Sequence, residues 1–138
     1  MTELVCSAVA AAPIPVIGLM GCVLVVDDDP EFRAMVRILL DPWHFKLLEA
    51  CDGKQCIALL RDQPVDAVLM DIVMPEQDGI ATLAHLKQQF PEILVVMVSG
   101  VERSPLYLSL AGQLGSDAVL HKSQICSVGK LLTEMLFD

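Results

Sequence analysis

The sequence is poor in aromatic residues and in positive charge. The first shortage limits what the hydrophobic core can be made of, and the second limits what the surface can bind. Aromatic residues make up 4% of the 138 residues, so a hydrophobic core must be built mainly from Val, Leu, Ile, Ala and Met. The chain has 9 Lys and Arg residues against 18 Asp and Glu residues, which gives a formal net charge of −9. Because an acidic surface repels a phosphate backbone, direct nucleic-acid binding is disfavoured.

The five cysteines and three histidines show no spacing typical of a bound metal. The number of cysteines is odd and no C-x-x-C motif occurs, which argues against a disulfide framework and against a zinc site. Small buried thiols of this kind are ordinary in a reducing compartment. We therefore expect free cysteines and a cytoplasmic protein.

Residues 1–20 are apolar but lack the features of a targeting or membrane segment. They contain Glu3 and no Lys or Arg, and Pro13 and Pro15 interrupt their apolar centre. A secretory signal needs a basic start, and a membrane helix needs about 20 continuous apolar residues. We expect no membrane insertion, a flexible or loosely docked extension over residues 1–20, and one domain over residues 21–138.

From Cys22 onward, short apolar runs alternate with amphipathic stretches, which are typical of buried parallel strands and of helices. The predicted strands are Cys22–Val26, Phe45–Glu49, Asp66–Met70, Ile93–Val98 and Ala118–His121. The predicted helices run from Pro30 to before Pro42 and over Gly53–Arg61, Ile80–Gln89, Ser104–Leu114 and Gln124–Phe137. Their predicted buried sides include Phe32 and Met35 in the first helix, Leu59 in the second and Phe90 just after the third. This alternation indicates an α/β fold, an open parallel sheet with helices on both faces.

Polar side chains follow four of the predicted strands. They are Asp27 and Asp28 after the first, Asp71 after the third, Ser99 after the fourth and Lys122 after the fifth. Ligands of such sheets bind at the carboxyl ends of the strands. Three carboxylates there would raise each other's pKa values unless a cation such as Mg²⁺ intervened, and Mg²⁺ also binds phosphate oxygens. The pattern predicts a socket for a phosphoryl group carried on a carboxylate.

Each of these residues also has an ordinary structural interpretation. Asp-Asp is common in caps and turns, Asp71 would suit a helix cap, Ser99-Gly100 a turn and Lys122 a surface position. Their joint occurrence at one edge of the predicted sheet favours the chemical interpretation.

Four segments resemble the receiver (CheY-like) domains of bacterial response regulators. The segments are Val23–Asp29, Val68–Gly79, Val95–Gly100 and Ala118–Lys122. The resemblance spans residues 21–138, and Met74-Pro75 with Asp78-Gly79 is its most distinctive part. It implies a flavodoxin-like, doubly wound five-stranded parallel sheet of order 2-1-3-4-5.

The resemblance also implies roles for individual residues. Asp71 would be the phosphoacceptor, Ser99 the switch hydroxyl, and Lys122 the partner of the phosphoryl oxygens. The implied Mg²⁺ ligands are Asp27 (directly or through water), Asp28, Asp71 and the backbone carbonyl of Val73.

A protein of this kind signals in a two-component phosphorelay and is no enzyme beyond self-phosphorylation from small donors and self-dephosphorylation. The implied donor is a histidine kinase or phosphotransfer protein, and phosphorylation would switch the affinity for a downstream protein or for a second copy of the chain. No helix-turn-helix follows the last predicted helix, so we expect output through a separate protein, unless the sequence is one domain of a longer regulator. The implied contact surface is the fourth helix, fifth strand and fifth helix, with Leu106, Tyr107 and Leu110 as candidates.

Four residues depart from the family pattern. Ser123 stands where the family usually has a proline, commonly after a cis peptide. A non-proline cis bond costs about 3 kcal/mol, so we expect either a trans peptide or a strained loop. Val119 replaces the common switch aromatic, so signalling would rest on Ser99 and the loop and helix after it. Val73 and Val101 cannot orient a hydrolytic water by hydrogen bonding, which predicts slow autodephosphorylation.

Three other functions stay open. The first is a degenerate receiver that serves only as a protein-interaction module, which Ser123 and Val119 favour. The second is a small aspartyl phosphotransferase or phosphatase, but Val73 stands where such enzymes carry a second acid. The third is a flavodoxin-like cofactor binder, although the aspartates after the first strand would repel the phosphate of FMN.

Overall fold

The computed structural model describes residues 21–72, 74, 79–100 and 105–137, apart from the side chains of residues 105–108. Five parallel strands form one sheet of order β2-β1-β3-β4-β5. The strands are β1 (Gly21–Val26), β2 (Phe45–Ala50), β3 (Ala67–Asp71), β4 (Leu94–Ser99) and β5 (Ala118–His121). The predicted parallel sheet and its order are confirmed.

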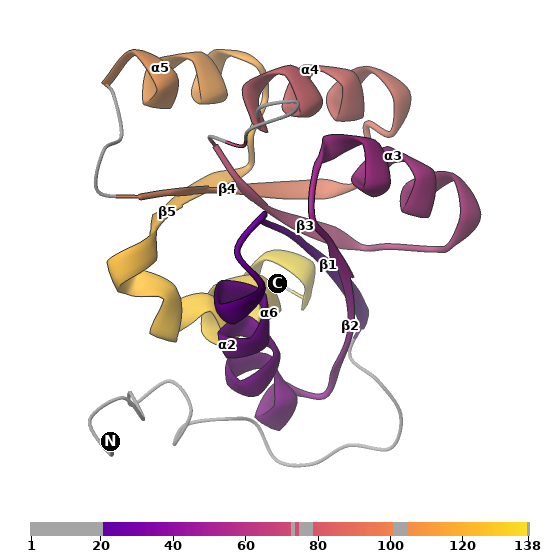
Figure 1. Cartoon of the computed structure of the whole chain (residues 1–138), viewed down its shortest axis with the longest axis vertical. Coiled ribbons are helices and arrows are strands. Elements are labelled where there is room, and N and C mark those ends of the chain that lie inside the picture. The colour runs from indigo at the N-terminus through magenta and orange to yellow at the C-terminus, as the bar shows by residue number, and fades with distance from the viewer. Residues whose placement is uncertain (1–20, 73, 75–78, 101–104, 138) are drawn as a thin grey trace.

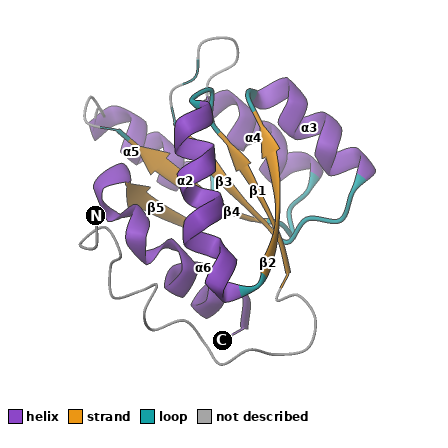
Figure 2. Ribbon diagram, turned by 60° about the horizontal axis from the view of Figure 1, so that its bottom comes forward, coloured by secondary structure: helices purple, strands orange, loops and turns teal. Residues whose placement is uncertain are grey.

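Helices cover both faces of this sheet (Figure 1). One face carries α3 (Gly53–Asp62), α4 (Gly79–Gln89) and α5 (Pro105–Gln113), and the other carries α2 (Pro30–Leu40) and α6 (Val128–Phe137), as Figure 2 also shows. Two short 3₁₀ helices, η2 (Asp41–Trp43) and η3 (Lys122–Ser127), join strands to helices. In the described part of the chain, the helices are all too short or too polar to cross a bilayer.

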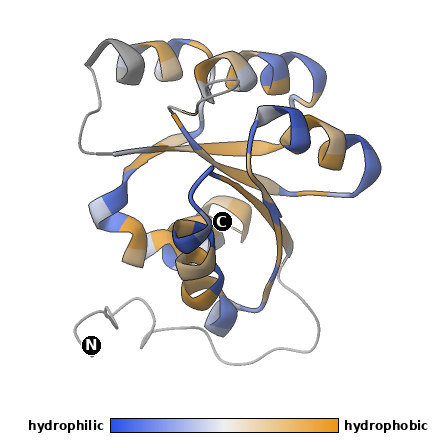
Figure 3. Ribbon diagram, in the orientation of Figure 1, coloured by the Kyte–Doolittle hydropathy of each residue, from blue (hydrophilic) through white to orange (hydrophobic). Residues whose placement is uncertain are grey.

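The central strands β1, β3 and β4 are buried on both sides, and this explains why they are so uniformly apolar. Val23 and Val25 of β1 belong to the core under α2 and α6, whereas Leu24 and Val26 belong to the core under α3, α4 and α5. The apolar residues accordingly concentrate on the sheet and on the helix faces turned toward it (Figure 3). A strand with no solvent-facing side needs no polar alternation, and such a run is easy to find in a sequence.

Aspartates start two of the helices. The side chain of Asp29 accepts a hydrogen bond of 2.9 Å from the N–H of Glu31, and Pro30 occupies the first turn of α2. The side chain of Asp52 accepts one of 2.9 Å from the N–H of Gln55 in α3. Such caps satisfy N–H groups that have no partner within the helix.

The predicted helices need three corrections. Met35, part of the predicted apolar stripe of α2, is 39% exposed, because the buried side of this helix is formed by Phe32, Val36, Leu39 and Leu40. Leu59 and Phe90, predicted to face inward, are only partly buried at the margin of the core. The predicted helix Gln124–Phe137 is two helices, because the chain first turns through η3 and becomes α-helical only at Val128.

Candidate functional site

The strand register brings the predicted site residues to one edge of the sheet. Val26 pairs with Met70, so that Asp27 and Asp71 come next on adjacent strands. Asp71 in turn pairs with Val98 of β4. The last residue of β4 is Ser99, which is 2% exposed. Lys122 follows β5 directly and begins η3.

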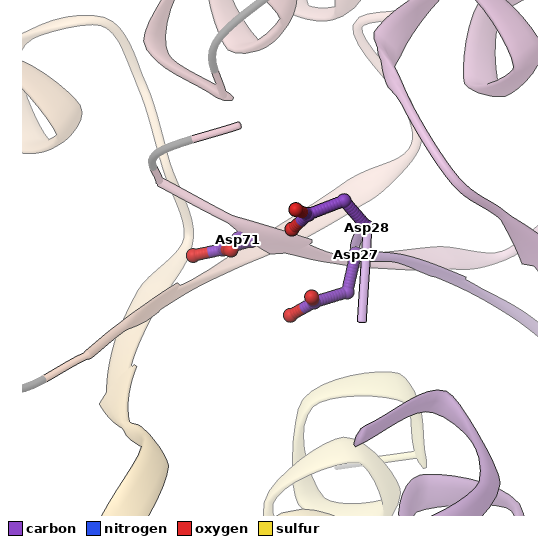
Figure 4. Close-up of side chains that lie close together, drawn as sticks. All are labelled: Asp27, Asp28 and Asp71. Carbon is purple, nitrogen blue, oxygen red and sulfur yellow. The ribbon is translucent and has the colours of Figure 1, made fainter. Parts of the chain in front are cut away.

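Three carboxylates form an acidic cluster at this edge: Asp27, Asp28 and Asp71. One carboxylate oxygen from each lies within 4.8 Å of the others. Asp27 and Asp71 are buried, whereas Asp28 is exposed. Figure 4 shows the side chains of Asp27 and Asp28 leaving the end of β1 on different sides and extending toward Asp71.

Asp27 is the least accessible member of the acidic cluster, at 1% exposure. Its Oδ1 accepts a hydrogen bond of 2.9 Å from the N–H of Asp29. Its buried Oδ2 makes no hydrogen bond within the described residues, although the ammonium of Lys122 lies 3.2 Å away as an ion pair. Burial raises the pKa of the Asp27 carboxyl above its usual value, and the Asp29 N–H and the Lys122 charge offset this only in part. The ionised form of Asp27 is therefore only partly compensated by its partners.

Lys122 reaches the acidic cluster from the end of β5, the outer strand of the sheet. Its Nζ lies 3.2 Å from Asp27 Oδ2 and 3.9 Å from Asp71 Oδ2, and 4.5 Å from the ring centre of Phe32 in α2. Partial burial lowers the pKa of Lys122, but the charges of Asp71 and Asp27 outweigh this and raise it overall. The lysine is thus held as a cation against two carboxylates and the face of an aromatic ring.

The donor set of the acidic cluster fits a hard divalent cation. Octahedral Mg²⁺ binds oxygen at 2.0–2.1 Å, so two opposite ligands stand about 4.2 Å apart. One oxygen of each carboxylate in the cluster lies within 4.8 Å of the others, which is close enough for small side-chain movements to bring all three to one ion. The buried Asp27 Oδ2 without a hydrogen bond is the kind of atom that such an ion satisfies. Asp27, Asp28 and Asp71 would hold the ion.

Gly79 brings helix α4 against the backbone beside Asp71. Its N–H donates a hydrogen bond of 2.8 Å to the carbonyl of Ile72. A Cβ at Gly79 would overlap the carbonyl oxygen of Asp71 and crowd the backbone of Ile72. A glycine is therefore required by this close approach of α4 to the end of β3.

Several predictions fall elsewhere. Val73 and Val101 lie outside the described residues, so the predicted backbone ligand and the predicted positions beside the hydrolytic water stay predictions. Val119, at the aromatic switch position, is 41% exposed. The described residues contain no cis peptide, so the bond between Lys122 and Ser123 is trans, which was one of the two expected outcomes. The free state of the described cysteines is also confirmed.

Sequence reasoning missed two features of the site. Phe32, read only as a core residue, also carries the Lys122 ammonium over its ring. His121 and Gln124 form a capping box around Lys122. A glutamine three residues after a candidate cap is the signal that would have suggested this box, but histidine is not among the usual capping residues.

Comparison with known sequences places these features in a family. The sequence model of the response regulator receiver domain matches residues 23–133. The transcriptional regulatory protein CpxR of Klebsiella pneumoniae is 39% identical over 103 residues, which cover 75% of this chain and 43% of that protein. The transcriptional regulatory protein ZraR of Escherichia coli is 39% identical over 77 residues, which cover 56% of this chain and 18% of that protein. The chain thus spans less than half the length of these relatives.

Solved structures agree with the sequence comparison. The receiver domain of NtrX from Brucella abortus superposes with a TM-score of 0.75 at 28% identity, covering 83% of this chain and 96% of that one. A CheY-like receiver domain from Methanospirillum hungatei reaches a TM-score of 0.79 at 21% identity, covering 84% and 93%. The Mn²⁺-bound form of the response regulator Rcp1 reaches 0.73 at 21% identity, covering 85% and 95%. At 21% identity the last two support the fold alone.

Proposed function

Because the chain belongs to the family of response regulator receiver domains, we propose that it accepts a phosphoryl group on Asp71 and then changes its affinity for a protein partner. The donor is a histidine kinase or a phosphotransfer protein. The observation that carries the proposal is the position of Lys122, whose Nζ lies 3.2 Å from Asp27 and 3.9 Å from Asp71 at the edge of the acidic cluster. A cation and three converging carboxylates are an arrangement suited to phosphoryl transfer.

In the proposed reaction, a carboxylate oxygen of Asp71 attacks the phosphorus of a phosphohistidine. The phosphorus–nitrogen bond breaks, its electron pair stays on the imidazole nitrogen, and that nitrogen takes a proton from solvent. Mg²⁺, held by Asp27, Asp28 and Asp71, supplies charge neutralisation when it is bound. Lys122 moves from its ion pair with Asp71 to the phosphoryl oxygens, and the buried hydroxyl of Ser99 donates to the same group.

The change of partner affinity is assigned to the surface of α5, β5 and α6. A shallow depression of about 300 Å³ lies on the β5 and α6 part of it, beside the exposed Val119, and Lys130, Leu131 and Glu134 help to line it. Of the predicted contact residues, Leu110 is half-buried, whereas the side chains of Leu106 and Tyr107 lie outside the described set. With Val119 in place of an aromatic ring, the signal passes through Ser99 and the segment that follows it. The partner is a downstream protein or a second copy of the chain.

The site of action is proposed to be the cytoplasm, and the output to be carried by another domain or protein. Similarity to CpxR and ZraR, both called transcriptional regulatory proteins, is consistent with an attached or separate output module. The chain as a whole has a formal net charge of −9, which opposes contact with DNA by its own surface.

The deciding experiment is intact-mass spectrometry of the chain after incubation with acetyl phosphate and Mg²⁺. We expect a gain of one phosphoryl group that is lost on Asp71→Asn and on removal of Mg²⁺ with a chelator. Asp66→Asn, which alters a carboxylate that accepts from the N–H of Cys22 at the opposite end of β1, is the matched control and keeps the modification. A parent protein that gains no mass would favour the degenerate receiver.

The lifetime of the phosphorylated form is a separate prediction. Val73 and Val101 offer no hydrogen bond to a hydrolytic water, so the phosphorylated chain should persist for at least minutes when no phosphatase is present. Decay is measured by following the mass of the phosphorylated chain after the small donor is removed. Loss within seconds would contradict this prediction, and Val73→Asp should shorten the lifetime.

A further inference from the structure

Reciprocal hydrogen bonds join the residues on either side of Lys122. The ring Nδ1 of His121 accepts a hydrogen bond of 3.1 Å from the N–H of Ser123 and lies 2.7 Å from the Ser123 hydroxyl. The side-chain oxygen of Gln124 accepts one of 3.1 Å from the N–H of His121. Because Nδ1 accepts from an N–H, the neutral ring carries its proton on Nε2, and the hydroxyl of Ser123 donates as well. We call this arrangement the His121–Gln124 clasp.

The His121–Gln124 clasp fixes the place where β5 ends and η3 begins. His121 is the last residue of β5 and the N-cap of η3, so Lys122 is the first residue of that helix. The backbone of Lys122 is therefore tied on both sides, to a paired strand through His121 and to the first helical turn through Ser123 and Gln124. Ser99 of β4 is the strand partner of His121, so the residue that begins the clasp is also held in the sheet.

The His121–Gln124 clasp includes position 123, directly after Lys122, where this chain has a serine in place of the family's usual proline. Ser123 has neither the ring nor the fixed φ of a proline, and the peptide before it is trans. Without a proline, the direction in which the chain leaves Lys122 depends on hydrogen bonds. Those that meet there come from the side chains of His121 and Gln124 and from the Ser123 hydroxyl.

We propose that His121 and Gln124 are positioning residues for Lys122, and that their clasp takes over the task a proline would perform at position 123. The clasp aims the ammonium of Lys122 at Asp27 and Asp71, from which its Nζ lies 3.2 and 3.9 Å. This inference rests on the proposed function, since it deepens the account of the same site. A charged group displaced by about 1 Å can lower a rate by up to about 100-fold, so loss of the clasp acts on the reaction without touching a reacting atom.

The test compares four variants of the full chain: His121→Ala, His121→Asn, Gln124→Ala and Ser127→Ala. The first and third break the clasp, whereas asparagine is a strong N-cap that restores an acceptor for the N–H groups of η3. Ser127→Ala is the matched control, because the Ser127 hydroxyl donates 2.8 Å to the carbonyl of Gln124 in the same helix without bordering Lys122. The rate of Asp71 phosphorylation by acetyl phosphate is measured at saturating Mg²⁺, together with Tm.

We expect His121→Ala and Gln124→Ala to slow phosphorylation about tenfold, with His121→Asn within about twofold of the parent and Ser127→Ala unchanged. A role in stability alone would lower Tm in His121→Ala without changing the rate of the folded protein. The proposal is overturned if His121→Ala reacts as fast as the parent, or if His121→Asn is as slow as His121→Ala.

A second measurement keeps this proposal separate from the proposed function. The position of the Lys122 side chain is observed directly in crystal structures of the parent, His121→Ala and Ser127→Ala. The Nζ of Lys122 should lie near 3.2 Å from Asp27 and 3.9 Å from Asp71 in the parent and in Ser127→Ala, and His121→Ala should lose both contacts. If the parent takes up no phosphoryl group, the proposed function fails, and these structures still decide whether the clasp positions the lysine. An unchanged Lys122 side chain in His121→Ala would refute the positioning role.

Discussion

The pKa values of two nearby carboxylates, Asp27 after β1 and Glu49 in the neighbouring β2, are shifted in opposite directions. Glu49 of β2 accepts hydrogen bonds from Arg37 at 2.6 and 3.1 Å and from Arg33 at 2.9 Å, and these hold its pKa below the usual value, with Arg37 the larger cause. Asp27, just past the end of β1, is nearly inaccessible, and its burial raises its pKa. The two arginines more than offset the burial of Glu49, whereas Lys122 offsets the burial of Asp27 only in part.

Arg33 makes the comparison sharper because it lies between the two groups. Its Nε donates to Glu49, but its Nη1 donates 2.7 Å to the backbone carbonyl of Asp27 and not to the carboxylate. The guanidinium of Arg33 thus reaches the backbone of Asp27, but the carboxylate that it contacts is that of Glu49 in β2. The acidic cluster keeps an excess of negative charge that favours a cation, while the Glu49 pair serves the fold.

The largest effect is expected from removing the cation that the site does have. Lys122→Ala should slow phosphorylation of Asp71 about 100-fold, because one preorganised charge at a reacting group contributes on that scale. Single-turnover rates with acetyl phosphate measure this. Lys130→Ala removes an exposed lysine from α6 and is expected to leave the rate within about twofold of the parent. Equal rates for the two variants would mean that Lys122 has no part in the reaction.

Neutralising Asp27 should weaken Mg²⁺ binding and strengthen the fold at the same time. Asp27→Asn removes a charged ligand, so Mg²⁺ affinity should fall about 10- to 100-fold. The folded pKa of Asp27 is raised, so its contribution to stability is present below the unfolded pKa and is lost as the pH rises through the folded pKa. At neutral pH without Mg²⁺, the variant should therefore be more stable by about 1 kcal/mol.

Isothermal titration with Mg²⁺ and urea unfolding in EDTA give these two quantities for Asp27→Asn. The gain in stability should shrink as the pH is lowered through the folded pKa, since the parent carboxyl then becomes neutral as well. A variant that loses stability in EDTA at neutral pH would show that Asp27 is well compensated, and the contrast with Glu49 would disappear.

Glu49 should give the smallest effect, and one of opposite sign. Glu49→Gln should lower the free energy of unfolding by about 0.5 kcal/mol at neutral pH, a value kept small by the partial solvent exposure of the group. Its folded pKa is lowered, so its contribution is present above the unfolded pKa and is lost as the pH falls through the folded pKa. Urea unfolding at several pH values measures this. Mg²⁺ affinity should be unchanged, and a large change would place Glu49 within the site.

The sequence was most informative where one physical rule decides the outcome. Strands β1, β3 and β4 are buried on both sides, and their apolar runs predicted their bounds to within one residue. The rule that ligands gather at the carboxyl ends of parallel strands predicts that Asp27, Asp28 and Asp71 lie together, as they do. These predictions depend on chain order and on burial, both of which are local to each element.

The features that the sequence did not predict depend on which of several nearby groups a side chain turns toward. Nothing in the pattern of α2 says that Arg33 donates to the carboxylate of Glu49 and not to that of Asp27. The uneven burial of Asp27 and Asp28, consecutive in the chain, comes from the different directions in which their side chains leave β1. The clasp around Lys122 depends on the rotamer of His121, which no spacing rule encodes.

The contact at Gly79 fixes the position of α4 relative to the end of β3 without help from the residues between them. The first N–H of α4 is hydrogen-bonded to the carbonyl of Ile72, and the missing side chain lets the two backbones touch. Because this anchorage uses only main-chain atoms, substitutions in the residues between Ile72 and Gly79 leave the starting point of the helix where it is. An added methyl group at position 79, by contrast, would push α4 outward and loosen the packing of its buried residue Leu83. A library of sequences between Met74 and Gly79 should therefore retain the fold, provided that the glycine is kept.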